Sequence, residues 1–467
     1  MVTLSLFNTL GRKIDALVPL EEGHVRLYTC GPTVYNVVHI GNLRTFLFED
    51  VLRRHLVSSG YRVTQIMNLT DVDDKTIRGS AEEGVPLPEF TAKYIDAFFR
   101  DIKRLNVEPV ERYPKATDHV PEMITMIEKL AERGHTYESE GSVYFRIATF
   151  PDYGRLSRID LSKTRRGERV ADDEYEKEDV KDFALWKAAK PGEPSWPSPF
   201  GQGRPGWHIE CSAMSMKYLG DHFDIHTGAV DNIFPHHENE IAQSEGATGK
   251  PFVSIWLHGE HLVVDGEKMS KSKGNFYTLD DVLARRDDRA AVRYLFLSVP
   301  YRRKLNFTWD ALAGAAAAVD RIREAALRIG EVAASAGSKT GAFDAAARSE
   351  KLRADFSAAM DDDLNTSEAL AALFPYLREV NAAIDDGSLD AAGAVAAKAA
   401  LTSADRVLGI LPAAPEVLPA EIEASIEARN AARKRRDFAE ADRIRAELSG
   451  KGIVLEDGPS GTRWKKA

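Results

Sequence analysis

Residues 24–71 read HVRLYTCGPTVYNVVHIGNLRTFLFEDVLRRHLVSSGYRVTQIMNLTD, and this stretch decides the fold. Residues 24–29 are β-rich and partly alternating, and residues 61–69 have the pattern of a second, buried strand. Between them, apolar residues recur near helical spacing from about residue 41 to residue 59. A strand, a loop, a helix and a second strand in this order predict a βαβ unit, in which the two strands are parallel.

The pattern continues on the carboxyl side of this unit. Residues 87–133 have a helical pattern and residues 136–146 have the pattern of strands. Residues 151–182 are dense in charge, and residues 190–206 are rich in Pro and Gly. This stretch indicates an insertion with mobile loops. Apolar strand patterns return at 222–226 and 252–257, with a helical pattern between them. We therefore expect a parallel sheet that is split by an insertion.

The last third of the chain is different in composition. Residues 309–411 are alanine-rich with helical periodicity and a loop expected at 330–341, which predicts a helical bundle. A Pro-punctuated linker follows at 413–421, and residues 428–467 then carry eleven basic and six acidic side chains. The net charge of −10 argues against a protein that coats nucleic acid by bulk electrostatics, but this basic tail is compatible with a local RNA contact. A solvated helix face is the alternative.

Two short segments suit phosphate binding. His39-Ile40-Gly41-Asn42 lies where the first strand leads into the first helix, and a helix start offers free N–H groups to an anion. Gly41 permits close approach, and His39 and Asn42 can donate hydrogen bonds. Lys268-Met269-Ser270-Lys271-Ser272 follows a strand-like segment and a turn, and it suits a mobile clamp on a polyphosphate. Taken alone, the first segment also fits a cap or turn, and the second a flexible surface loop.

Four side chains have the chemistry of a zinc site. They are Cys30, Cys211, His236 and Glu240. His236 and Glu240 are four residues apart on an expected helix that opens at Pro235, so they face the same side. Sequence spacing cannot show that all four meet, and His237 and His208 are rival ligands. The alternatives are two buried, inert thiols and an ion-pair cluster at a helix start.

Five segments carry a resemblance to a known family. They are YTCGPTVYNVVHIGNLRTFLFEDVLRR, LTDVDDK, GWHIECSAM, PHHENEIAQ and GEKMSKSKGN, in this order. They resemble those of the bacterial cysteinyl-tRNA synthetases, which are class I aminoacyl-tRNA synthetases. The resemblance covers residues 4–308, and a weaker one continues through the tail. It implies a ligase that activates L-cysteine with ATP, releases pyrophosphate and transfers cysteine to the 3′ end of tRNA(Cys).

The resemblance also implies roles for individual residues. The residues expected to act on ATP phosphates are His39, Asn42, Lys268 and Lys271. Those expected to complete the ATP and adenylate site are Gly31, Thr33, Gly41 and Asp231. Those expected to bind the amino acid are Thr70 and Trp207. One zinc ion, held by Cys30, Cys211, His236 and Glu240, is expected to select the substrate thiolate over the hydroxyl of serine. Mg²⁺ is expected as the counter-ion of ATP, and a monomer is expected because the family is mostly monomeric.

One position departs from the family pattern. The family usually has Gly-Gly where this chain has Gly228-Ala229. If residue 229 required a positive φ or a close ligand approach, alanine would shift the wall beside the ribose.

The expected fold class is α/β. We expect a Rossmann-type parallel-sheet catalytic domain split by an insertion, then an α-helical bundle and a small C-terminal domain. The expected boundaries are 1–115 and 206–260 for the two catalytic halves, 116–205 for the connective insertion, 261–308 for the KMSKS loop and stem-contact region, 309–412 for the bundle and 419–467 for the basic anticodon-binding domain. No apolar stretch approaches the roughly 20 residues of a membrane-spanning helix, and we see no secretory signal, so we expect a cytoplasmic protein without membrane contact.

Two other functions fit the same motifs. A ligase of thiol-cofactor biosynthesis that joins cysteine to an amino sugar resembles this core but lacks an anticodon-binding tail. A catalytically dead RNA-binding paralogue is the other alternative, and the intact histidine, lysines and ligand residues argue against it.

Overall fold

The computed structural model describes residues 4–159, 182–335, 341–411, 420–458 and 461–466. Contacts divide the chain into two units, Met1–Leu411 and Pro412–Ala467, each of which is described by itself. Most of the charged stretch expected at 151–182 and most of the linker expected at 413–421 lie outside the described residues. The centre of the loop expected at 330–341 also lies outside them.

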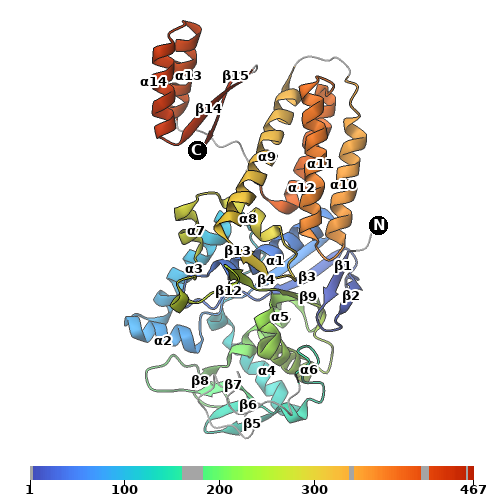
Figure 1. Ribbon diagram of the computed structural model, residues 1–467. Coiled ribbons are helices and arrows are strands. Elements are labelled where there is room, and N and C mark those ends of the chain that lie inside the picture. Colours follow the sequence, from blue (N-terminus) through green and yellow to red (C-terminus); the bar gives the residue numbers. More distant parts are fainter. Residues whose placement is uncertain (1–3, 160–181, 336–340, 412–419, 459–460, 467) are drawn as a thin grey trace. The chain divides into compact units, whose positions relative to one another are not determined.

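A four-stranded parallel sheet forms the centre of the first unit, with the strand order β10-β9-β3-β4 (Figure 1). The strands are β3 (His24–Thr29), β4 (Arg62–Met67), β9 (Phe223–Ala229) and β10 (Val253–Gly259). Helix α1 (Ile40–Ser58) connects β3 to β4, so the expected βαβ unit is present. Nearly every residue of β3 and β9 is buried, as in parallel sheets that are covered on both faces. The expected α/β class is confirmed.

The insertion between β4 and β9 holds helices and a second, antiparallel sheet of order β5-β6-β7-β8. Its helices are α2 (Asp74–Glu83), α3 (Leu87–Arg104), α4 (Val120–Glu132) and α5 (Trp207–Leu219). Its strands are β5 (Thr136–Ser139), β6 (Ser142–Phe145), β7 (Phe183–Ala188) and β8 (Gly203–Pro205). The helical pattern is interrupted between α3 and α4, where Arg112 and Lys115 run beside β4 as isolated bridges. Pro109 and Pro114 disfavour helix there.

Three further groups of elements surround the parallel sheet of the first unit. Helix α6 (Glu238–Thr248) joins β9 to β10. After β10, strands β11 (Leu262–Val264), β12 (Glu267–Lys268) and β13 (Leu305–Phe307) form a small sheet, and helices α7 (Leu279–Arg285) and α8 (Arg289–Leu297) lie between β12 and β13 in the chain. At the amino end, β1 (Ser5–Asn8) and β2 (Lys13–Ala16) pair as an antiparallel hairpin.

The helical bundle is continuous with the core of the sheet. It consists of α9 (Trp309–Ala334), α10 (Ala345–Asp361), α11 (Thr366–Asp385) and α12 (Ala391–Leu408). Leu27 of β3 and Leu52 of α1 belong to the same buried cluster as Leu370 and Leu401 of the bundle. No helix among the described residues is both long and apolar enough to cross a bilayer.

The second unit has its own small core. Helices α13 (Ala420–Lys434) and α14 (Phe438–Gly450) precede the hairpin of β14 (Ile453–Gly458) and β15 (Gly461–Lys466). Ile422, Ile444, Leu448 and Leu455 are buried together.

Candidate active site

One wall of the site lies just beyond the carboxyl ends of β3 and β4. The amide of Gly31 donates to Asn68 Oδ1 at 2.9 Å, and Thr33 pairs with Thr70 as a parallel bridge. A Cβ atom on Gly31 would come within 1.7 Å of the carbonyl oxygen of Asn68, so glycine is required at this position. The buried Thr70 hydroxyl accepts a hydrogen bond from Asn68 Nδ2 at 3.1 Å. Three residues expected at the adenylate and substrate sites therefore lie next to one another beyond these strands.

The four candidate zinc ligands meet beside this wall. Cys30 follows β3, Cys211 lies on α5, His236 precedes α6 and Glu240 lies on its first turn. One ligand atom from each lies within 4.8 Å of the others, and all four side chains are buried. His236 Nε2 is 3.0 Å from Glu240 Oε1, yet this oxygen has no partner in hydrogen-bond geometry. The expected helix opening at Pro235 falls in a π-helical turn, Ile233–His237, that leads directly into α6, and the only non-helical backbone in that turn is at Phe234.

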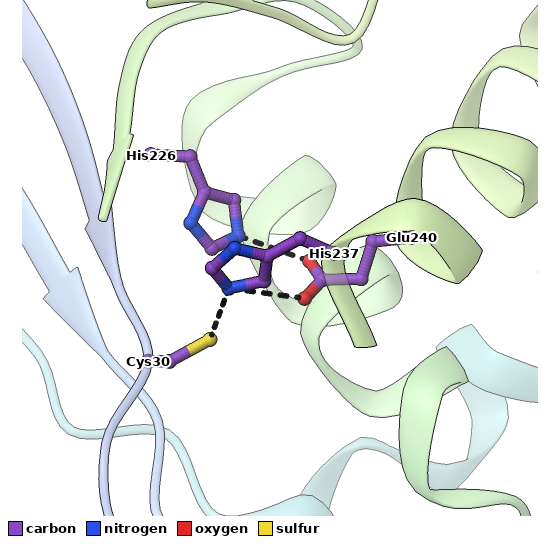
Figure 2. Close-up of side chains that lie close together, drawn as sticks. All are labelled: Cys30, His226, His237 and Glu240. Atoms are coloured by element: carbon purple, nitrogen blue, oxygen red, sulfur yellow. Dashed lines mark hydrogen bonds and ion pairs between the residues drawn. The ribbon is translucent and has the colours of Figure 1, made fainter. Parts of the chain in front are cut away.

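A second set of possible ligands overlaps the first. It consists of Cys30, His226, His237 and Glu240, which also converge within 4.8 Å (Figure 2). His237 Nε2 lies 3.2 Å from Cys30 Sγ, and His226 Nε2 lies 3.0 Å from Glu240 Oε2. The rings of His226 and His237 have no exposed surface. The ring of His236, by contrast, stacks on Trp207, which is 38% exposed, so the first set is the one beside a solvent-facing side chain.

The acidic groups of the first set stabilise a positive charge between them, which in the metal-free cluster is the proton on His236. Burial opposes ionisation of Cys211, but a hydrogen bond from Cys30 and the charge of His236 lower the pKa of Cys211 to about 6. Burial likewise opposes charge on His236 and Glu240, yet attraction across the cluster raises the pKa of His236 to about 10 and lowers the pKa of Glu240 to about 2. Burial raises the pKa of Cys30. Buried thiol, imidazole and carboxylate donors that converge in this way fit a soft divalent ion such as zinc.

Further histidines surround these ligands. His208 Nδ1 lies 2.9 Å from His236 Nδ1, which leaves His236 Nε2 facing Glu240. His237 Nδ1 lies 2.8 Å from His258 Nε2. His208 and His237 were expected as rival ligands, whereas His226 and His258 were not identified from the sequence. His258 lies near the carboxyl end of the parallel strand β10, where ligands bind, but His226 lies in the middle of β9 and no local signal marks it.

The start of α1 holds two side-chain N–H donor groups for which the described residues offer no hydrogen-bond acceptor. His39 Nδ1 accepts a hydrogen bond from the amide of Asn42 at 3.1 Å, and Asn42 Oδ1 accepts one from the amide of His39 at 3.2 Å. Burial lowers the pKa of His39, so the ring is neutral at pH 7 and carries its proton on Nε2. The Nε2–H of His39 and the side-chain amide of Asn42 are then left to donate beside the positive end of the helix dipole, which is a suitable site for phosphate.

The lysine-rich segment lies against this helix start. The amide of Ile40 donates to Tyr277 O at 3.0 Å, and His39 pairs with Thr278. A Cβ atom on Gly41 would come within 2.8 Å of Met269 Cε, so the two segments are in contact. Lys268 is exposed at the end of β12, and the backbone of Lys271 begins a short 3₁₀ turn.

The remaining expected residues lie at the ribose-side loop. Asp231 is exposed, with Oδ2 3.5 Å from His261 Nδ1, and its charge acts on the ring of His39. Ala229 has φ −83°, so this backbone does not require glycine there. The close approach occurs at Gly228 instead, where a Cβ atom would come within 2.7 Å of His237 Cε1.

The comparisons with known proteins agree with this geometry. Family profiles match residues 16–317 as "tRNA synthetases class I (C) catalytic domain", residues 355–412 as "DALR domain" and residues 416–464 as "Cysteinyl-tRNA ligase anticodon binding domain". A cysteine–tRNA ligase of Solibacter usitatus is 48% identical over the whole of both chains. A cysteine–tRNA ligase of Brachyspira hyodysenteriae is 46% identical, again over the whole of both chains.

The chain belongs to the cysteine–tRNA ligase family.

The resemblance inferred from the motifs is thereby confirmed. Solved structures of other class I synthetases share the fold of this member of the cysteine–tRNA ligase family. A Mycobacterium tuberculosis methionyl-tRNA synthetase in complex with methionyl-adenylate aligns with a TM-score of 0.58 at 16% identity, covering 83% of this chain and 90% of that one. The LeuRS of Agrobacterium radiobacter, solved in a ternary complex with tRNA, aligns with a TM-score of 0.61 at 10% identity, covering 84% of each chain.

Proposed function

We propose that the chain activates L-cysteine with ATP at the crevice beyond β3 and β4, and that a zinc ion held by Cys30, Cys211, His236 and Glu240 selects the substrate thiol. As a cysteine–tRNA ligase the chain then joins cysteine to tRNA, for which tRNA(Cys) is the proposed acceptor. The observation that carries the proposal is the convergence of two thiols, an imidazole and a carboxylate in one buried cluster.

The protein's own groups have distinct tasks in the activation step. His39 and Asn42 donate hydrogen bonds to ATP phosphates at the helix start, where the dipole favours anions. Lys268 and Lys271 neutralise the charge that grows on the departing pyrophosphate, and Mg²⁺ accompanies ATP as its counter-ion. Because the chemistry is an in-line attack on the α-phosphorus by the cysteine carboxylate, positioning accounts for much of the rate.

Selection of the amino acid is assigned to the buried ligand cluster and its neighbours. Serine is nearly isosteric with cysteine, so ordinary pocket contacts would separate the two poorly. When bound, zinc would favour a soft thiolate over a neutral hydroxyl. Thr70 and Trp207 bound the space beside the cluster and orient the amino acid. The basic second unit and the bundle are proposed to hold the anticodon arm, with Arg and Lys on phosphates.

The decisive experiment combines metal analysis with cysteine-dependent ATP–pyrophosphate exchange. We expect one zinc ion per chain. We expect His236→Ala to lose the ion and to raise the KM for cysteine by at least about 10-fold, with the KM for ATP within about 2-fold, because one ligand of the thiol-selecting ion is removed. His55→Ala is the matched control, because His55 is equally buried and pairs with Asp361 away from the cluster. Unchanged cysteine affinity in a metal-depleted His236 variant would refute the zinc assignment.

His226→Ala distinguishes the two overlapping ligand sets. If the first set holds the ion, this variant still binds one equivalent of zinc at saturation, with affinity lowered by about 10–100-fold through the loss of a partner of Glu240. Loss of stoichiometric binding would instead assign the ion to the second set. Charging of tRNA, compared with coupling of cysteine to an amino sugar, tests the rival ligase. Absence of any cysteine-dependent exchange would favour the dead paralogue.

A further inference from the structure

Residues 262–299 form one excursion from the parallel sheet, which we call the lysine module because it carries Lys268 and Lys271. The module leaves after β10 and returns at β13, and its two ends lie side by side. The amide of Glu260 donates to Tyr301 O at 2.8 Å, and the amide of Leu305 donates to His261 O at 3.1 Å. Strand β11 also pairs with β13 in parallel. The two ends of the module therefore meet at residues 260–261 and 300–305, which we call its base. Helix α8 of the module is held as well, because the buried Arg293 donates to Asp50 of α1 and to the carbonyl oxygen of Leu408.

Arg44 binds this base from α1. Its Nη1 donates to Glu260 O at 2.7 Å and to His261 O at 3.1 Å. Its Nη2 donates to Pro300 O at 3.1 Å and to Arg303 O at 2.6 Å. The side chain is 4% exposed. One buried guanidinium thus joins the outgoing end of the module, the returning end and the helix that begins with His39 and Asn42.

The number of hydrogen bonds explains why arginine occupies this position. Each terminal nitrogen of a guanidinium has two N–H groups, and all four are used on the four carbonyl oxygens. The planar fork holds these donors in fixed directions, whereas a lysine ammonium has three donors on a flexible stem. A lysine at position 44 would leave at least one of these four carbonyl oxygens without its side-chain donor and would not hold the two ends in one plane.

The far end of the module also contacts α1, but through contacts near the ligand crevice. Ile40 meets Tyr277, and Gly41 meets Met269, as described above. Arg44 lies one turn further along the helix and touches neither the metal ligands nor the wall at Gly31 and Thr70 in any hydrogen bond of the described residues. Its hydrogen bonds therefore affect the position of the lysine module relative to the start of α1.

We propose that Arg44 is a positioning residue for the ATP half of the reaction, because it sets the placement of the module that carries Lys268 and Lys271 relative to His39 and Asn42. The inference rests on the proposed function. Activation of an amino acid needs donors on both sides of the phosphate chain at once, and displacements of about 1 Å can cost about 100-fold in rate. The cysteine site uses β3, β4, α5 and α6, so its affinity does not depend on Arg44.

The test is cysteine-dependent pyrophosphate exchange by the full chain carrying Arg44→Lys. We expect kcat/KM for ATP to fall by about 10–100-fold, while the KM for cysteine stays within about 2-fold and one metal ion per chain is retained. Arg204→Lys is the matched control. Arg204 lies on β8 of the insertion, is 3% exposed and donates to the carboxylates of Glu193 and Asp74, none of which belongs to the module. Its loss should lower stability comparably and leave kcat/KM for ATP within about 2-fold.

Arg44→Gln is the second variant, because it is uncharged and keeps only two N–H donors, and we expect it to lose at least as much kcat/KM for ATP as Arg44→Lys. The inference is overturned if the folded Arg44 variants keep normal kcat/KM for ATP, if the KM for cysteine rises as much as the KM for ATP, or if Arg204→Lys has the same effect. A wild-type chain without cysteine-dependent exchange would instead refute the proposed function, so the two failures are distinguishable.

Discussion

At the scale of single residues, Glu49 of α1 is a carboxyl group buried in the first unit. The hydroxyl of Thr227 donates to its Oε1 at 2.8 Å, while Oε2 has no hydrogen-bond partner in the described residues. Burial raises the pKa of Glu49 to about 8 from an ordinary value of 4.5. The folded chain therefore binds one more proton than the unfolded chain between these two pH values. Stability must fall as the pH rises through this window.

Replacement of this group should change the pH dependence of folding. We expect Glu49→Gln to be more stable than wild type at pH 8, and the advantage at pH 8 to exceed that at pH 5 by about 3 kcal/mol, because glutamine has no proton to lose. Denaturant unfolding at both pH values measures the difference. Glu22→Gln, at an exposed position, should show no such change. If Glu49→Gln and wild type differ in free energy of unfolding by the same amount at pH 5 and at pH 8, Glu49 is ionised in the folded chain.

At the scale of elements, the junction of β3 and β4 depends on a close backbone approach. A Cβ atom on Gly31 would overlap the carbonyl group of Asn68 at 1.7 Å, and backbone cannot move aside as a side-chain tip can. We expect Gly31→Ala to lower the free energy of unfolding by about 3 kcal/mol or more and to reduce bound zinc, because Cys30 is its neighbour. Thermal unfolding and metal analysis measure both effects.

Gly314→Ala is the control for this prediction, because Gly314 has room for a side chain. It lies inside α9, is exposed, and has nothing within 4 Å of the position of an added Cβ. Gly314→Ala should stabilise the chain by up to about 1 kcal/mol, because alanine has the higher helix propensity. A Gly31→Ala protein as stable as Gly314→Ala would show that the two strands do not approach as described.

The elements themselves were largely predictable from local patterns. The periodicity of residues 41–59 indicated α1, and the structure starts it one residue earlier. The break between α3 and α4 was not predicted, because residues 105–119 gain their conformation from pairing with β4, which lies elsewhere in the chain. Helical periodicity reports on near neighbours, whereas such bridges depend on what packs alongside.

At the scale of the whole molecule, the second unit concentrates positive charge in a chain of net charge −10. Lys434 and Arg435 are exposed at the end of α13. If they bind tRNA phosphates, Lys434→Gln with Arg435→Gln should raise the KM for tRNA several-fold. The slope of log KM against log salt should then become shallower by about 1–2, because each lost phosphate contact removes about 0.7–0.9 of counterion release. Aminoacylation assays at several salt concentrations give the slope.

Pyrophosphate exchange without tRNA should be unchanged in this double variant, because it does not use the second unit. Lys13→Gln with Lys250→Gln removes the same charge from exposed positions of the first unit and serves as the control. An unchanged salt slope in the Lys434 and Arg435 variant, or an equal change in the control, would remove these two residues from the tRNA contact.

The sequence by itself determined the α/β class, the order of the elements, the two segments proposed to bind phosphate, and the family. These are read from local periodicity and contiguous motifs, which short stretches of chain contain in full. Only the tertiary structure decided which side chains meet. Pairing of Thr29 with Thr227 brings Cys30 beside the end of β9, and that register places His226 and Glu240 near a sulfur almost two hundred residues away in the chain. Convergence over such separations depends on strand order and register, and no local pattern encodes the distance between two atoms.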